Sequence, residues 1–483
     1  MISSLILVAS GLSFAVQPGC ESCHLEITKS FSNTGMGRSV GLPVPASSTI
    51  FHPFSGSKLT TKGTNHRIER DGLSAQYRAA LRIGSGKIGS SFSVLIGGQW
   101  FQSPISWYAQ SRQFRLSPGY EQERYPDFDR PIRSECLYCH ANNTAPQPAA
   151  MGCDRCHGDG AQHAAKPSKQ NIVNPARLYG ARRDSVCEQC HLPGAARVLN
   201  PVTQASHYAA GQLLEDTWTT YVAGGDFKVA SHVEQLAQSA CLQKAESKMW
   251  CGSCHNPHPT QSRPQPDVDA VCRSCHQPHE NGNDRCATCH MPKRGAQDVV
   301  HAAYTDHRIQ RPGQTAPPVQ RSLRAWRTPG KYEQRNLGLA LFEWGTNIRD
   351  VESLQRAFAT LIDLPAGEKD APVLSAVGSL SLQKGRPVEA RSWLAEASRR
   401  EPLDAEAHLR LGRAEQANGR ASEALQQYEE AIRLDPLLFD AYVLAAQIHK
   451  TNGNTEAYRE VLRRYLQHVP GSLVARKALA AAR

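Results

Sequence analysis

The chain has 483 residues, of which 15 are cysteine, and it carries a net charge of +11. Its length predicts two or three domains rather than one core. Fifteen cysteines are many for a cytosolic protein, so an ordinary cytosolic enzyme is disfavoured.

The chain begins with an apolar segment that predicts export. Residues 1–15, MISSLILVASGLSFA, combine an apolar run with a Ser13-x-Ala15 pattern that suits signal-peptide cleavage. The run is too short to span a membrane, and no later segment reads as transmembrane. We therefore expect a signal peptide at 1–15 and a periplasmic or otherwise exported protein.

Fourteen of the cysteines form seven Cys-x-x-Cys pairs, and a histidine follows each pair directly. The cysteines are Cys20, Cys23, Cys136, Cys139, Cys153, Cys156, Cys187, Cys190, Cys251, Cys254, Cys272, Cys275, Cys286 and Cys289. The histidines are His24, His140, His157, His191, His255, His276 and His290. Structural zinc or a thiol redox pair would explain paired cysteines but does not require the histidine. Covalent haem attachment requires it, because two thiols bond the porphyrin and the adjacent imidazole binds the iron. The sequence therefore predicts seven covalently attached haem c groups with their iron.

The positive charge lies before residue 331. Residues 1–330 hold 34 Lys and Arg against 24 Asp and Glu, whereas residues 331–483 hold 21 against 20. A basic balance can indicate nucleic-acid binding. Here a ferric c-type haem with its two propionates contributes a charge of about −1, so seven haems offset most of the excess. Lysines and arginines beside propionates are the expected use, and we expect no nucleic-acid partner.

The motifs are unevenly spaced. Residues 46–118 contain no cysteine and alternate polar with apolar residues between Gly and Ser-Pro turns, which predicts a small antiparallel β subdomain. Six motifs then follow within residues 119–310, at intervals as short as 17, 21 and 14 residues between first cysteines. So little chain per haem predicts a haem-packed core with mostly irregular structure and short helices. We assign residues 16–310 to this heptahaem domain.

The composition changes after a Pro- and Arg-rich linker at 311–330. Gly385, Gly419 and Gly453 lie 34 residues apart, and so do Pro402, Pro436 and Pro470. A 34-residue period with these residues indicates tetratricopeptide-type helix pairs. Residues 331–483 are therefore predicted to form an all-α solenoid with a terminal capping helix at 473–483. A concave docking surface is one interpretation, and a packing extension of the cytochrome part is the other.

A second axial ligand decides what each iron can do. A histidine or methionine opposite the proximal histidine makes an electron-transfer site, whereas an open face permits substrate chemistry. Nine further histidines lie before residue 331, against three after it. We predict distal ligation by His163, His232, His258, His301 and His307, and by His52 and His66 at the β region. His258 follows proximal His255 too closely to reach the same iron, so it should serve a neighbouring haem. His207 and His279 are assigned either to an iron or to a hydrogen bond with a propionate.

Met36 is a further candidate ligand. It stands between two glycines, just after the helix-like segment LEITKSFSNT. Ligation of the first haem by this thioether would raise its potential relative to a bis-histidine site. The alternative is core packing, in which case His52 or His66 is the expected distal ligand.

These elements together resemble multihaem c-type cytochromes of the cytochrome c-552/c-554 type, fused here to a tetratricopeptide tail. The resemblance rests on the opening CESCHLEITKSFSNT, on CHGDGAQH, SHVEQLAQSAC and CGSCHNPH, and on CHMPK with VVHAAYTDHRI, and covers roughly residues 17–310. It implies a periplasmic electron carrier with closely packed haems.

The expected function is electron transfer between redox partner proteins, docked through the repeats. The alternative is an oxidoreductase that acts on a small nitrogen or sulfur compound at one open-faced haem. The sequence contains no CxxCK motif, which the resemblance associates with multihaem nitrite reductases. Cys241, the odd cysteine, is expected to be a buried thiol or to pair between chains. The oligomeric state stays open.

Overall fold

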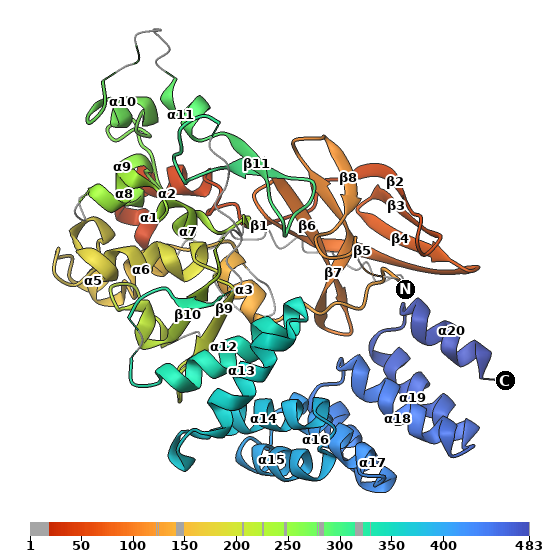
Figure 1. The fold of residues 1–483 in the computed structure, drawn as a ribbon. Helices are drawn as coiled ribbons and strands as arrows, with labels where there is room; N and C mark the ends of the chain where they lie inside the picture. The colour runs from red at the N-terminus through yellow and green to blue at the C-terminus, as the bar shows by residue number, and fades with distance from the viewer. Residues whose placement is uncertain are drawn as a thin grey trace.

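The computed structural model describes residues 19–482, apart from positions 122, 124, 142–148, 205–206, 225–226, 246–248, 278, 280–284, 314–321 and 329. The expected signal peptide at 1–15 lies outside the described residues, as does part of the expected linker at 311–330. The chain runs through a β-sheet, a region of short helices and a helical solenoid (Figure 1). Within the described residues, no helix is long and apolar enough to cross a membrane.

The N-terminal part is a regular antiparallel sheet of eight strands. These are β1 Val40–Gly41, β2 Ala46–His52, β3 Ser57–Gly63, β4 Asn65–Arg70, β5 Leu73–Ile83, β6 Gly89–Ile96, β7 Gln99–Tyr108 and β8 Gln113–Leu116. The strands pair in sequence order from β2 to β8, and β1 pairs with β5. The end strands β2 and β8 contact each other, so the sheet is nearly closed. The predicted antiparallel β region at 46–118 is confirmed, and β1 is added to it from the preceding segment.

The sheet has its own core. Every second residue of β4 is buried, beginning with His66, because alternate side chains of a strand point to opposite faces. Leu59, Ile68, Val94 and Phe101 belong to one apolar cluster. The expectation of a haem-packed, mostly irregular fold is therefore wrong for this N-terminal part, whose interior is filled by strand side chains.

Short helices and small strand pairs carry the motifs after the first. The helices of this region and of the first motif are α1 Cys20–Cys23, α2 Leu25–Ser32, α3 Ser134–His140, α4 Asp154–His157, α5 Ala161–Ala165, α6 Gly180–His191, α7 His232–Leu236, α8 Ala240–Lys244, α9 Cys251–Cys254, α10 Val268–Arg273 and α11 Cys286–His290. Strands β9 Ala196–Leu199, β10 Trp218–Val222 and β13 Arg324–Ala325 form one sheet, and β11 Lys293–Gly295 pairs with β12 Ala303–Thr305. The motifs lie in these helices or at their ends, and not before them as the sequence suggested.

The C-terminal part is the predicted solenoid of helix pairs. Its helices are α12 Glu333–Ile348, α13 Val351–Ile362, α14 Ala371–Gln383, α15 Pro387–Arg400, α16 Ala405–Ala417, α17 Ala421–Leu434, α18 Phe439–Thr451, α19 Thr455–His468 and α20 Leu473–Ala481. Gly385, Gly419 and Gly453 turn the chain inside each pair with φ between +70° and +76°, a conformation that favours glycine. At Gly412 an added Cβ would lie 2.4 Å from a ring carbon of Tyr428, so the helices of this pair cross too closely for a side chain.

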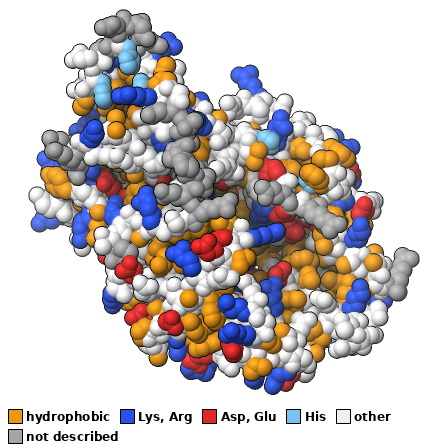
Figure 2. Space-filling view, in the orientation of Figure 1, with side chains coloured by type: hydrophobic (Ala, Val, Ile, Leu, Met, Phe, Trp, Pro, Cys, Tyr) orange, Lys and Arg blue, Asp and Glu red, His pale blue; other side chains and the backbone are white. Residues whose placement is uncertain are grey.

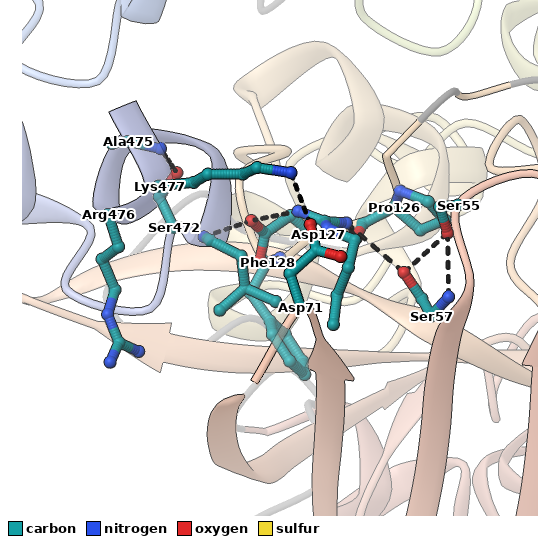
Figure 3. Close-up of polar contacts among 12 residues, drawn as sticks. Ser55, Ser57, Asp71, Pro126, Asp127, Phe128, Ser472, Ala475, Arg476 and Lys477 are labelled. Atoms are coloured by element: carbon teal, nitrogen blue, oxygen red, sulfur yellow. Dashed lines mark hydrogen bonds and ion pairs between the residues drawn. The ribbon is translucent and has the colours of Figure 1, made fainter. Parts of the chain in front are cut away.

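The solenoid is attached to the rest of the chain at both ends. At its start, Leu341 and Trp344 of α12 share an apolar cluster with Tyr221 of β10. At its end, α20 lies against the loop between β4 and β5 (Figure 3). There the carboxylate of Asp127 accepts a hydrogen bond from the backbone N–H of Leu473 at 2.6 Å. Sheet and solenoid residues consequently share one apolar cluster.

Candidate haem-attachment sites

One helical turn brings the three groups of a motif together. The backbone N–H of His24, His157, His255 and His276 each donates to the carbonyl of the first cysteine of its own motif, at 2.9–3.0 Å. Residues three and four apart lie on one face of a helical turn. Both thiols and the imidazole of a motif are therefore presented on the same side, as attachment to one porphyrin requires.

Four proximal histidines have a second histidine ring at nearly the same distance. The ring centres of His24 and His163 lie 6.3 Å apart, and those of His157 and His258 are also 6.3 Å apart. The separation is 6.2 Å for His255 and His307 and 6.0 Å for His279 and His290. The two ring planes of each pair differ by 13° to 34°.

This separation matches a metal ion between two imidazoles. A metal–imidazole bond is about 2 Å long and the ring centre lies roughly 1 Å beyond the nitrogen, so two ligands place their ring centres about 6 Å apart. Direct packing between the rings would bring carbon atoms to roughly 4 Å. The two thiols, the proximal imidazole and a second imidazole at this distance fit a covalently attached haem.

One histidine of each pair is oriented by a hydrogen bond. The Nδ1 of His157 donates to the carbonyl of Val173 at 2.7 Å, and that of His290 to the carbonyl of Gln310 at 2.9 Å. The Nδ1 of His307 donates to the carbonyl of Thr305 at 2.9 Å, and that of His163 to the carbonyl of Ser168 at 3.0 Å. A carbonyl can only accept, so Nδ1 carries the proton and Nε2 keeps the lone pair that a metal binds.

A cluster of four histidines lies between the fourth and fifth motifs. The ring centre of His232 is 5.2 Å from that of His191 and 4.7 Å from that of His307, which also faces His255. Burial, together with the neighbouring imidazoles of His191, His307 and His255, lowers the pKa of His232 to about 3. Burial also lowers the pKa of His191, His255 and His307, which favours the neutral form that binds a metal.

Cysteines of different motifs also contact one another. The thiol of Cys139 shares a hydrogen bond with Cys190, and Cys187 shares one with Cys251. Cys20 is hydrogen-bonded to Cys153. The structure therefore brings the second motif to the fourth and the first to the third, which are not consecutive in sequence, and it also brings together the consecutive fourth and fifth motifs.

The remaining candidates have other surroundings. His66 is buried in the sheet, where its Nδ1 contacts the hydroxyl of Ser103 at 2.7 Å and burial lowers its pKa to about 4. His52 is also buried and its Nε2 has no hydrogen-bond partner among the described residues. His301 lies with its ring centre 5.2 Å from that of Tyr108. His207 accepts a hydrogen bond from the backbone N–H of Gln204.

Met36 and Cys241 are the last two residues that the sequence analysis singled out. Met36 is half-buried in the loop after α2, where its carbonyl accepts a hydrogen bond from the N–H of Ser39. The ring stacked opposite His24 is that of His163. Cys241 is half-buried in α8.

The sequence left open whether His279 binds an iron or a propionate, although its spacing from the preceding motif was a signal for iron binding. His279 follows proximal His276 by three residues, as His258 follows His255, and both lie opposite the proximal histidine of another motif. Figure 2 shows histidine side chains at the surface of the lobe that carries α10 and α11. Within the described residues, no group of three or more His, Cys, Asp or Glu side chains forms a site for a bare metal ion.

Comparison with known proteins finds one family match and one weak similarity. Residues 376–437 and 409–472 match the family described as Tetratricopeptide repeat, so the solenoid contains tetratricopeptide repeats. The chain also has weak similarity to the multiheme cytochrome MtrA of Shewanella baltica (strain OS185). The two are 23% identical over an alignment of 203 positions, which covers 36% of this chain and 56% of MtrA. The chain thus matches little more than half the length of this curated relative.

Solved structures match about a third of this chain, with low TM-scores. The crystal structure of MamA is 20% identical with a TM-score of 0.27 and covers 31% of this chain and 81% of MamA. YrrB, described as a tetratricopeptide protein with an unusual peptide-binding site, is 20% identical with a TM-score of 0.25 and covers 30% of this chain and 77% of YrrB.

Proposed function

We propose that this chain is an exported c-type cytochrome that attaches seven haems and carries electrons between redox proteins. The observation that carries the proposal is the group of histidine pairs at 6.0–6.3 Å, each of which includes the histidine of a Cys-x-x-Cys-His turn. The weak similarity to MtrA supports the same class of protein. The c-552/c-554 type within this class stays a prediction.

The chain's own residues supply attachment and axial ligation. The fourteen motif cysteines would form the thioethers, and the seven adjacent histidines would be the proximal ligands. The proposed second ligands are His163 opposite His24, His258 opposite His157, His307 opposite His255 and His279 opposite His290. His232, whose ring centre lies 5.2 Å from that of His191, is the candidate for the site of His191. His163 thereby takes the place that the sequence offered to Met36. His52, His66 and His301 remain candidates for the sites of His140 and His276.

A bound haem supplies a one-electron iron couple. At the sites with a histidine pair, both imidazoles would bind the iron, and the carbonyl-bound Nδ1 atoms would hold the ligand rings in place. Two imidazole ligands leave no position for a substrate, which suits electron transfer better than catalysis.

The tetratricopeptide repeats would serve as the docking module. Such repeats commonly present a surface to protein partners, and a redox partner is the occupant that the haem sites suggest. The attachment of α12 and α20 to the rest of the chain would hold that surface in a constant position relative to the motifs.

Ferric-state spectroscopy with added ligand tests this function against the oxidoreductase alternative. We expect only six-coordinate, low-spin haem, with no change on addition of cyanide or nitrite. A haem that is high-spin and binds these ligands would favour catalysis at an open iron. N-terminal sequencing of the protein from a periplasmic fraction tests export, with cleavage after Ala15 as the expected result.

A further inference from the structure

His163 is held differently from the other oriented histidines. The Nδ1 atoms of His157, His290 and His307 donate to backbone carbonyls. A backbone carbonyl is present whatever side chain stands at that position. The Nδ1 of His163 lies 3.0 Å from the carbonyl of Ser168 and also 3.1 Å from the side-chain Oδ1 of Asn171. Here the identity of a side chain can influence the imidazole.

The orientation of the Asn171 amide follows from its partners. Its Nδ2 donates to the carbonyl of Lys166 at 2.7 Å and to the carbonyl of Gln162 at 3.2 Å. Both acceptors are carbonyls, so the group facing them is the NH₂ and the group facing His163 is the oxygen. The N–H of Ser168 donates to the same oxygen at 3.3 Å. The half-buried Asn171 thus closes the loop that follows α5, and its Oδ1 accepts a hydrogen bond from the Nδ1–H of His163.

We infer that Asn171 is a positioning residue for His163 and that it sets the reduction potential of the haem site at Cys20, Cys23 and His24. This inference rests on the proposed function. A hydrogen bond from Nδ1–H to an oxygen makes Nε2 a stronger donor, and a stronger axial donor favours the ferric state. The strength of the Asn171 acceptor therefore moves the potential of this one site.

Two substitutions of Asn171 separate this role from a purely structural one. N171D and N171A both lose the two hydrogen bonds to the carbonyls of Lys166 and Gln162, so both loosen the loop. They differ in the hydrogen-bond acceptor that faces His163. N171D places a charged oxygen there, whereas N171A places no oxygen there. Charge-assisted hydrogen bonds are roughly twice as strong as neutral ones. Q170E is the matched charge control, since Gln170 is the exposed neighbour.

The measurement is spectroelectrochemical titration of the full chain, with electron paramagnetic resonance of the ferric protein. We expect N171D to lower one of the seven potentials by more than Q170E does, N171A to raise the same potential, and the low-spin signal of that haem to change in both. Shifts of N171D and N171A in the same direction, or an N171D shift no larger than that of Q170E, would overturn the inference. A wild-type protein without covalent haem would instead refute the proposed function.

Discussion

A histidine that follows one motif lies opposite the proximal histidine of another. His258 follows His255 by three residues and faces His157, and His163 follows His157 and faces His24. Each such segment therefore contributes to two sites, one through its proximal histidine and one through the second histidine. Loss of a single histidine should disturb a site whose cysteines lie far away in sequence.

This dependence gives a residue-scale prediction. In H258M, a thioether replaces one imidazole, and we expect the potential of one haem to rise. That haem should be the one attached at Cys153 and Cys156. Adding C153A and C156A should remove both the haem and the altered signal, as measured by voltammetry and visible spectra. H449M in the solenoid is the control. The pairing is contradicted if the altered signal survives C153A and C156A but disappears with C251A and C254A.

The geometry of each motif was predictable from sequence because the motif is local. Two cysteines and a histidine within five residues occupy one helical turn wherever the chain goes. The partner of His24 was not predictable, because His163 is brought beside it only by the packing of distant segments. For His258, spacing excluded its own iron, but the fold was needed to show that His157 is the partner.

At the scale of secondary-structure elements, the eight-stranded sheet and helix α20 meet at the buried carboxylate of Asp127. Asp127 accepts hydrogen bonds from the N–H groups of Leu473 and Phe128, and the guanidinium of Arg70 lies 3.9 Å away. Burial nevertheless raises the pKa of Asp127 to about 6. Burial raises the pKa of nearby Asp129 to about 7, with Asp127 and Glu123 adding to the effect.

The sign of the pH dependence follows from these shifts. A carboxyl whose folded-state pKa is raised contributes stability at pH values below its unfolded pKa, and loses it as pH rises through the folded pKa. We expect thermal stability to fall between about pH 4 and pH 7, with Asp127 responsible for at most about 3 kcal/mol of the fall, between about pH 4 and pH 6. The thermal stability of D127N should fall less steeply as the pH rises. D71N is the control, because the hydrogen bond from Lys477 lowers the pKa of Asp71. The stability that Asp71 contributes is therefore lost as the pH falls, not as it rises. An unchanged slope in D127N would contradict this account.

The bounds of the sheet were predictable, but its buried face was not predictable in full, because polar residues interrupt the hydrophobic pattern. Ser57, His66 and Ser103 are buried on its strands, where alternation alone predicts apolar residues. Hydrogen bonds between these side chains, such as that of His66 with Ser103, satisfy them inside the fold. The solenoid was easier to predict, because its period of 34 repeats the same turn glycine in three helix pairs.

At the scale of the whole molecule, the solenoid is fastened to the motif-bearing part by a buried arginine. Arg335 of α12 is only 4% exposed at its side chain and pairs with Asp370 at 2.6 Å. It also donates to the carbonyl of Leu199 in β9 at 3.0 Å. The guanidinium therefore joins the first solenoid helix, the start of α14 and the small sheet of the motif-bearing part.

Replacing this arginine should loosen the attachment of the solenoid. R335M leaves the half-exposed carboxylate of Asp370 and the carbonyl of Leu199 without their partner, and a hydrogen bond to a charged group contributes about 1.5–3 kcal/mol. Hydrogen exchange should show faster exchange in α12 and in β9. R399M removes a pair with Glu396 at the surface and should destabilise the protein less. Equal effects of the two substitutions would show that Arg335 does not fasten the two parts.

The central claim is that the fourteen motif cysteines hold seven haems, and the intact mass of the purified, denatured protein tests it most directly. Denaturation removes any group that is not covalently bound. We predict the mass of the mature chain plus seven haems, a loss of one haem in C20A/C23A, and one thiol, that of Cys241, reactive toward alkylating reagents. A mass equal to that of the polypeptide alone, with the motif cysteines open to alkylation, would contradict the account.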